Sequence, residues 1–129
     1  MVKRAITVII FTLILVGLGL AESIIVNKIV INLDNDVGAL VTKYEANKDD
    51  VTSLLSDIDN IKQNWNKNEN MLCLVFNHKD MSIITDSLSR LRTYTQNNDY
   101  DNGIVELKLL KVNTEKQPHI MGFNIHNIL

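Results

Sequence analysis

The sequence is poor in cysteine, proline and aromatic residues, and each shortage excludes something. Cys73 is the only cysteine among 129 residues, so an intramolecular disulfide and a cysteine-rich zinc site are impossible, while an intermolecular disulfide remains open. There is one proline, and aromatic residues make up only 5% of the chain although hydrophobic residues make up 46%. Such a chain builds its core from Ile, Leu and Val, which α-helices bury easily. We therefore predict an all-α protein.

A surplus of positive charge is also absent. The formal net charge is −2, and it falls to −4 when the two basic residues Lys3 and Arg4 are left out. Proteins that bind nucleic acid need clustered Lys and Arg to displace counterions, so we expect no nucleic-acid partner. A chain of this length has room for one small domain besides an address segment.

One long apolar run dominates the N-terminus. Residues 5–21 carry no charge, and two basic residues precede them. As a helix rising about 1.5 Å per residue, the run covers roughly 26 Å, and continuation to Val26 completes a hydrocarbon core about 30 Å thick. The basic flank favours a cytoplasmic N-terminus. We predict a signal-anchor over residues 1–26, with residues 5–26 in the lipid bilayer of the cell membrane and the C-terminal domain outside the cytoplasm.

A cleaved signal peptide is the alternative. Gly19 and Ala21 are small residues at the positions that a signal peptidase requires, and cleavage after Ala21 would release a secreted soluble helical binding protein. The apolar run is longer than the usual signal-peptide core of about 7 to 15 residues, and the helical pattern continues past Ala21. We therefore favour a retained anchor.

An apolar stripe follows the anchor. Its members recur every three or four residues, as they do along one face of a helix. They are Val26, Val30, Leu33, Val37, Leu40 and Tyr44. This spacing predicts a juxtamembrane helix over residues 27–46. If one side of the stripe is free, it can pair two protomers, and we then expect a homodimer that Val37→Asp disrupts.

Four polar residues end that helix and begin the predicted extracytoplasmic helical bundle, residues 47–129. Asp49 or Asp50 is suited to cap the next helix, which should continue as one seam with three- and four-residue spacings. The seam consists of Val51, Leu54, Ile58, Ile61, Trp65, Asn68, Leu72 and Val75. We interpret Trp65 as a core anchor whose indole N–H donates to a carbonyl, and Asn68 as a residue at a polar edge or one that fixes the register.

Two more helices complete the prediction. Asp80 is expected to cap the first of them, and Arg90 lies outside its inner face. That inner face consists of Met81, Ile84, Leu88, Leu91 and Thr95. The last helix is expected to end by Pro118, because the residue before a proline avoids helical geometry. The apolar tail from Ile120 to Leu129 should dock on the bundle, and the short connections predict antiparallel neighbours.

Chemistry-bearing residues do not converge in this sequence. The histidines are His78, His119 and His126, and no pair of them has the four-residue spacing of a helical metal site. The glycines and serines form no phosphate loop and no nucleophile elbow. We therefore predict a protein that is not an enzyme and has no catalytic residue, metal or cofactor. The candidate interaction or structural residues are Trp65, Asn68, His78, Asp80 and Arg90.

Several segments in a fixed order carry a resemblance. They are the basic start with its apolar anchor, "NW" at residues 64–65, His78 and Asp80, "SLSRL" at 87–91, "ELKLL" at 106–110, Pro118 and the final "NIL". Together they resemble a bacterial family of small membrane-anchored proteins, domain-of-unknown-function family 4363. The resemblance implies a bacterial source, a helical body at the membrane and a multi-pass membrane protein as a possible partner, but no activity. We therefore expect a single-pass, membrane-anchored helical interaction or accessory protein.

Overall fold

The protein is all-α in a computed structural model that describes the backbone of residues 1–121 and the side chains of residues 1–116. This part of the chain contains five helices and no strand. The helices are α1 (Val2–Ala46), α2 (Val51–Lys67), α3 (Glu69–Leu72), α4 (His78–Gln96) and α5 (Tyr100–Met121). The predicted fold class, a long N-terminal helix that continues into a helical bundle, is confirmed.

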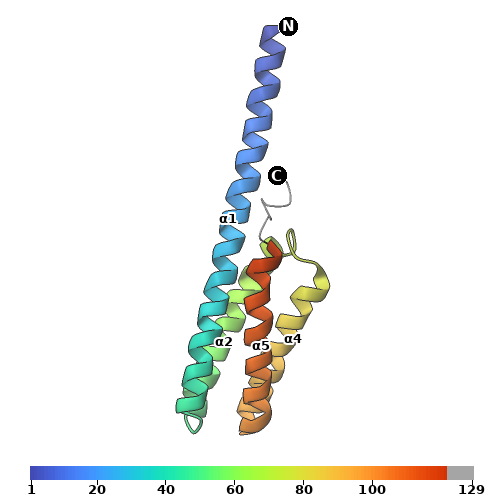
Figure 1. The fold of residues 1–129 in the computed structure, drawn as a ribbon. Coiled ribbons are helices and arrows are strands. Elements are labelled where there is room, and N and C mark those ends of the chain that lie inside the picture. The colour runs from blue at the N-terminus through green and yellow to red at the C-terminus, as the bar shows by residue number, and fades with distance from the viewer. Residues whose placement is uncertain (122–129) are drawn as a thin grey trace.

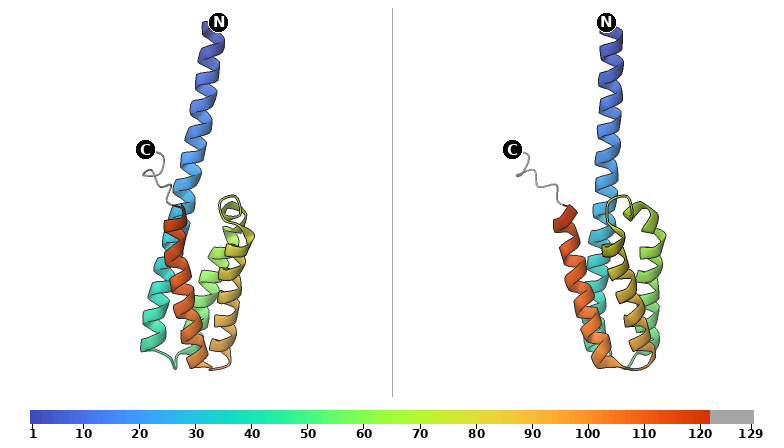
Figure 2. Two further views of the ribbon diagram at one scale, coloured as in Figure 1. Left: turned by 45° about the vertical axis from the view of Figure 1, so that its right-hand side comes forward. Right: turned by 90° about the vertical axis from the view of Figure 1, so that its right-hand side faces the viewer.

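The four long helices form an up-and-down bundle (Figure 1). Each helix runs antiparallel to the one before it, and α5 returns beside α1. α5 packs against both α1 and α4, while α2 packs against α4 and, less extensively, against α1. Short connections favour this arrangement, because they leave consecutive helices no other way to pack. The N-terminal half of α1 projects beyond the bundle in both views of Figure 2.

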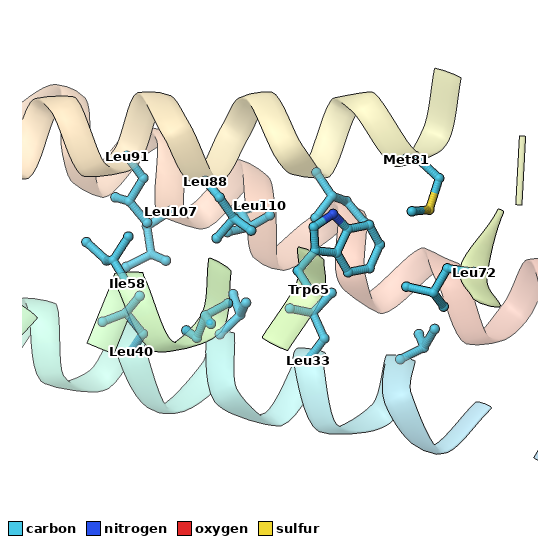
Figure 3. Packing of buried hydrophobic residues seen from close by; sticks show 14 of the residues in the cluster. Leu33, Leu40, Ile58, Trp65, Leu72, Met81, Leu88, Leu91, Leu107 and Leu110 are labelled. Carbon is cyan, nitrogen blue, oxygen red and sulfur yellow. The ribbon is translucent and has the colours of Figure 1, made fainter. Parts of the chain in front are cut away.

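One aliphatic core holds the bundle together. All six members of the α1 stripe, from Val26 to Tyr44, are buried, and so is the inner face predicted for α4. Trp65 lies in the middle of this core, next to Leu33 of α1 (Figure 3). Burying one aliphatic side chain contributes about 1.5–3 kcal/mol, so the core stabilises the bundle without a disulfide.

The α1 stripe is covered within its own chain. Val37 has no exposed surface, because α2 and α5 pack against this half of α1. The stripe therefore has no free side through which two protomers could pair. A homodimer remains a prediction, but it requires another surface.

Side-chain caps set the starts of two helices. Asp50 accepts a hydrogen bond from the backbone N–H of Ser53 at 3.3 Å, which confirms one of the two residues expected to cap α2. At α4 the prediction was wrong, because the cap is Asn77, whose side chain accepts from the N–H of Asp80 at 2.8 Å. A cap must lie two or three residues before the N–H it accepts from, and Asn77 meets this condition. The Asp80 carboxylate lies in the first turn, where the helix dipole favours negative charge.

The seam expected to run unbroken from Val51 to Val75 is interrupted at Asn68. α2 ends at Lys67, and α3 adds a single separate turn. The Asn68 side chain donates to the carbonyl oxygen of Asn64 at 2.8 Å and so satisfies a carbonyl near the end of α2. Leu72 is still buried, but Val75 is exposed. A side-chain amide that competes for backbone hydrogen bonds ends the helix here, which the spacing of apolar residues does not reveal.

α5 passes through Pro118 and ends at Met121, so the predicted stop before the proline was wrong. A proline this close to the end of a helix removes one main-chain hydrogen bond, and the preceding turns are fixed because Leu107, Leu110 and Thr114 are buried. The predicted docking of the tail concerns residues 122–129 and the side chain of Ile120, which lie outside the described part of the chain.

The C-terminal end of α1 meets the start of α5 at Gly103. The Tyr44 hydroxyl lies 3.1 Å from Thr95 Oγ1, and its ring stacks on Tyr100 with ring centroids 5.3 Å apart. A Cβ at position 103 would lie only 2.1 Å from Tyr44 Oη. Glycine is therefore required here, because it lets the tyrosine fill the space of a side chain.

Candidate functional site

The N-terminal half of α1 is an apolar surface that no other described residue covers. None of its large apolar side chains is buried, and this half of the helix projects beyond the bundle (Figures 1 and 2). The two polar side chains within residues 5–21 bond inside the helix, because Thr7 and Thr12 donate to the carbonyl oxygens of Lys3 and Val8, both at 2.9 Å. Internal bonding of this kind suits a segment in lipid, where water cannot satisfy polar groups. This helix is long and apolar enough to cross a membrane.

The apolar surface continues to the point where the bundle begins. Ile24 and Ile25 are exposed, at 68% and 46%, and Val26 is the first buried residue of the core. Glu22 is the only charged residue between the apolar run and that core. No flexible linker separates the two, because α1 remains helical throughout. The apolar half and the bundle are therefore joined by one continuous helix.

A groove runs between α1 and α2. Its volume is about 570 Å³, and Trp65 and Asn68 are among the residues that line it. The other polar lining residues are Asn32, Asn35, Asp36 and Asn64. A second hollow of about 370 Å³ shares Asp36, Ile61 and Asn64 with the groove and continues it along the same two helices. The arrangement offers amide donors and acceptors beside an apolar floor, which suits binding of a polar chain segment.

Two of the candidate residues predicted from the sequence are brought together at this groove. Trp65 is 3% exposed, so it is the predicted core anchor, but its indole N–H donates at 3.0 Å to the hydroxyl oxygen Oγ1 of Thr85 and not to the predicted carbonyl. Asn68 is half-buried at the break after α2. The groove's other amides were missed, although Asn32 and Asn35 on one helix and Asn64 on the next flank the apolar stripes, a signal that the sequence contains.

The other three candidates lie elsewhere. His78 and Asp80 belong to the first turn of α4, where Asp80 has a local role at the helix start. Arg90 lies further along α4, on its side toward α5, where its Nη2 donates to Glu106 Oε1 at 2.9 Å. The five candidates therefore do not form one site.

Arg90 belongs to a polar cluster that joins α4 to α5. Ser87 Oγ also donates to Glu106 Oε1, and both Ser87 and Glu106 are buried. Burial by itself raises the pKa of Glu106, but the hydrogen bonds from Arg90 and Ser87 outweigh it and hold that pKa below its ordinary value. The buried hydroxyl of Ser87 donates to a carboxylate, and this cluster joins α4 to α5.

A second cluster joins α5 to α1. Lys111 Nζ and Thr114 Oγ1 each donate to Asp34 Oδ1 at 2.8 Å. Burial lowers the pKa of Lys111, but Asp34 and Glu115 outweigh that effect, and the pKa is raised. Together with the Arg90–Glu106 pair, this cluster fixes α5 between its two neighbours.

Comparison with known proteins gives a family. A family model described as "Domain of unknown function (DUF4363)" matches residues 23–128. The match spans most of the chain, so the protein belongs to this family, and the sequence resemblance is confirmed. The matched region begins just after the apolar run and contains the whole buried core. No curated protein and no solved structure was found to match.

Proposed function

We propose that this member of the DUF4363 family is a single-pass, N-terminally anchored membrane protein whose bundle is an interaction or accessory module outside the cytoplasm. The observation that carries the proposal is the exposed apolar half of α1, joined without a break to a well-packed bundle. A helix that is apolar on all sides needs either a protein core or lipid around it. The basic residues Lys3 and Arg4 support a cytoplasmic N-terminus.

The bundle is proposed to bind rather than to catalyse. The Ser87–Glu106–Arg90 cluster resembles a catalytic constellation most, but its hydroxyl and carboxylate are buried and bonded to each other. The groove between α1 and α2 begins at Ile29, one turn from the apolar surface of the anchor. A partner that lies in the same membrane could therefore reach it, and we propose a multi-pass membrane protein as that partner.

Fractionation and intact mass test the anchor. We expect the full-length chain, expressed in a bacterial host, to stay with the membrane after carbonate extraction. A soluble species that begins at Glu22 would contradict the anchor and support secretion after cleavage at Ala21. That alternative is compatible with the fold, because the buried core begins at Val26 and cleavage would remove none of it.

Labelling of single cysteines tests the orientation. In a Cys73→Ala background, Lys48→Cys places a thiol in the exposed turn after α1, at the far end of the bundle. We expect a membrane-impermeant maleimide to label it in intact cells. The matched control, Val2→Cys, should react only after lysis. The reverse pattern would place the bundle in the cytoplasm and reject this part of the proposal.

A photoreactive amino acid tests the groove. Placed at Asn35, which lines the groove and is exposed, it should crosslink to a larger membrane protein in cells. The same residue placed at Asp101, exposed at the start of α5, is the control and should give no product. A product of twice the chain mass would indicate a homodimer instead, and no product would contradict a role of the groove in binding.

A further inference from the structure

The end of the bundle nearest the anchor carries exposed apolar side chains. The chain from α3 to the start of α4, residues 69–76, forms a tip that we call the α3 tip. Leu74 is 75% exposed, and Val75 and Met71 are exposed as well. In contrast, Leu72 and Phe76 of the same tip are buried in the core. The exposed side chains are therefore held in place by buried neighbours and do not belong to a free loop.

The α3 tip lies at the end of the bundle from which α1 projects (Figures 1 and 2). Figure 3 gives the order along the core, in which Leu72 lies beyond Leu33 in the direction of the N-terminal half of α1. On α1 the exposed Ile24 and Ile25 precede the core directly. The apolar surface of the anchor and that of the tip therefore reach the same level of the molecule.

We propose that the α3 tip contacts the interface of the bilayer that α1 crosses, as a second membrane contact. The inference rests on the proposed anchoring, because only an anchored α1 brings the bilayer surface to this level. Leu74 and Val75 would then exchange water for the boundary between headgroups and acyl chains, which favours apolar side chains. Lys67 and Lys79 flank the tip and are exposed, and their long stems let the charged heads reach the lipid headgroups.

Two membrane contacts would fix the orientation of the bundle relative to the bilayer, which one contact cannot do. A single spanning helix leaves the bundle free to rotate about the helix axis and to tilt with it. A second contact at the α3 tip, across the bundle from α1, restricts both motions. The groove between α1 and α2 would then face a fixed direction relative to the membrane surface.

Depth-dependent quenching tests this contact in the full chain. In a Cys73→Ala background, Leu74→Cys is labelled with a small environment-sensitive fluorophore and reconstituted into phosphatidylcholine–phosphatidylglycerol vesicles with nitroxide groups at the headgroups. Lys48→Cys, at the opposite end of the bundle, is the matched control. We expect at least threefold stronger quenching at position 74, with a blue-shifted emission. Val75→Cys should behave like Leu74→Cys.

A third label separates failure of the inference from failure of the anchor. Leu13→Cys reports the apolar half of α1 and should be quenched by nitroxides placed deep in the acyl chains. If position 13 is quenched but positions 74 and 48 are equally and weakly quenched, the anchor holds and the second membrane contact is overturned. The exposed side chains of the α3 tip would then be a surface for a protein partner. If position 13 is not quenched and the protein does not float with the vesicles, the anchor itself is rejected. The protein can insert into the vesicles in either orientation without affecting the test, because the α3 tip faces the adjacent leaflet in both orientations.

Discussion

The two halves of α1 form one uninterrupted helix, yet they differ completely in what surrounds them. In the first half, apolar side chains cover every side of the helix and none is buried. In the second half, a single stripe of six residues is buried and the other faces carry mainly polar side chains. Helix formation is local and does not distinguish the halves. The halves differ in how apolar residues are distributed around the helix axis. A helix with apolar residues along one face packs into a bundle, and a helix with apolar residues on all faces suits lipid.

The comparison also teaches how the two environments are joined. The change from apolar residues on all faces to a single buried apolar face occurs within one turn, between Ile25 and Val26. The helix continues through that point, so backbone hydrogen bonds connect the bundle to the apolar half. This protein therefore differs from one in which a domain is tethered through a flexible linker.

The same substitution in each half should give the largest and most opposite effects. Val37→Asp places a carboxylate at a fully buried position in the apolar core. We expect a loss of about 4 kcal/mol or more in the free energy of unfolding. Val16→Asp changes a side chain that is 54% exposed outside the bundle. It should leave the unfolding of the bundle unchanged and weaken membrane insertion by about 3 kcal/mol.

Two measurements separate these effects. Thermal unfolding of the full chain in detergent, followed by circular dichroism, reports the bundle, and carbonate extraction reports insertion. The comparison between the halves breaks down if Val16→Asp lowers the unfolding temperature as much as Val37→Asp. It would also break down if neither variant changed membrane retention.

Two glycines of the bundle differ in how closely other side chains approach them. Gly103→Ala would bring a methyl group within 2.1 Å of Tyr44 Oη, and we expect a loss of about 2–3 kcal/mol through overpacking. Gly38→Ala is the matched control, because its new Cβ would meet only the flexible end of Lys111 at 3.5 Å. In a helix interior alanine is favoured over glycine by up to about 1 kcal/mol, so Gly38→Ala should be neutral or stabilising.

A double variant identifies the cause of the Gly103 effect. Tyr44→Phe removes the hydroxyl that lies closest to the new methyl group, but it leaves the ring carbon at 3.0 Å. We therefore expect Tyr44→Phe to rescue part of the loss caused by Gly103→Ala, measured by chemical unfolding. If the two losses simply add, the clash with Tyr44 is not the reason that glycine is required.

Much of the fold could be predicted from single helices. The continuity of α1, its buried stripe and the inner face of α4 follow from apolar spacing, which depends only on residues of the same helix. The predicted cap at Asp80 and the predicted stop at Pro118 were wrong for a related reason. Both relied on one residue's preference, and the neighbours decided the outcome through the amide of Asn77 and the buried turns of α5.

The candidate sites were harder to predict because they join different helices. Glu106 lies 19 residues from Ser87 along the chain, and no pattern within α4 or α5 indicates that their side chains meet. The groove likewise combines Asn32 of α1 with Asn64 of α2. Sequence spacing gives the face of a helix on which a residue lies, but the partner across the interface depends on how the helices are shifted along each other. Val75, a member of the predicted seam, is exposed beyond the break at Asn68, which the spacing did not reveal.

The smallest expected effect concerns how the stability of the bundle depends on pH. Glu106→Gln removes a carboxylate that accepts from Arg90 and Ser87, and we expect it to cost about 1–2 kcal/mol at pH 7. Because the folded-state pKa of Glu106 is lowered, its contribution is fully present above the unfolded value near 4.5 and is lost as the pH falls through the folded pKa. The difference between wild type and variant should therefore shrink below pH 4.5.

A second glutamate provides the matched control. Glu45 pairs with Lys108 at 3.2 Å, but both side chains are at least half exposed, and Glu45→Gln should change stability by less than about 0.5 kcal/mol. Chemical unfolding of the three proteins between pH 3 and pH 7 makes the measurement. Equal losses in both variants, or a Glu106→Gln loss that is as large at pH 3 as at pH 7, would contradict the assigned role. In that case the Arg90–Glu106–Ser87 cluster does not stabilise the packing of α5 against α4, and apolar burial together with the Lys111–Asp34 pair holds α5 in place.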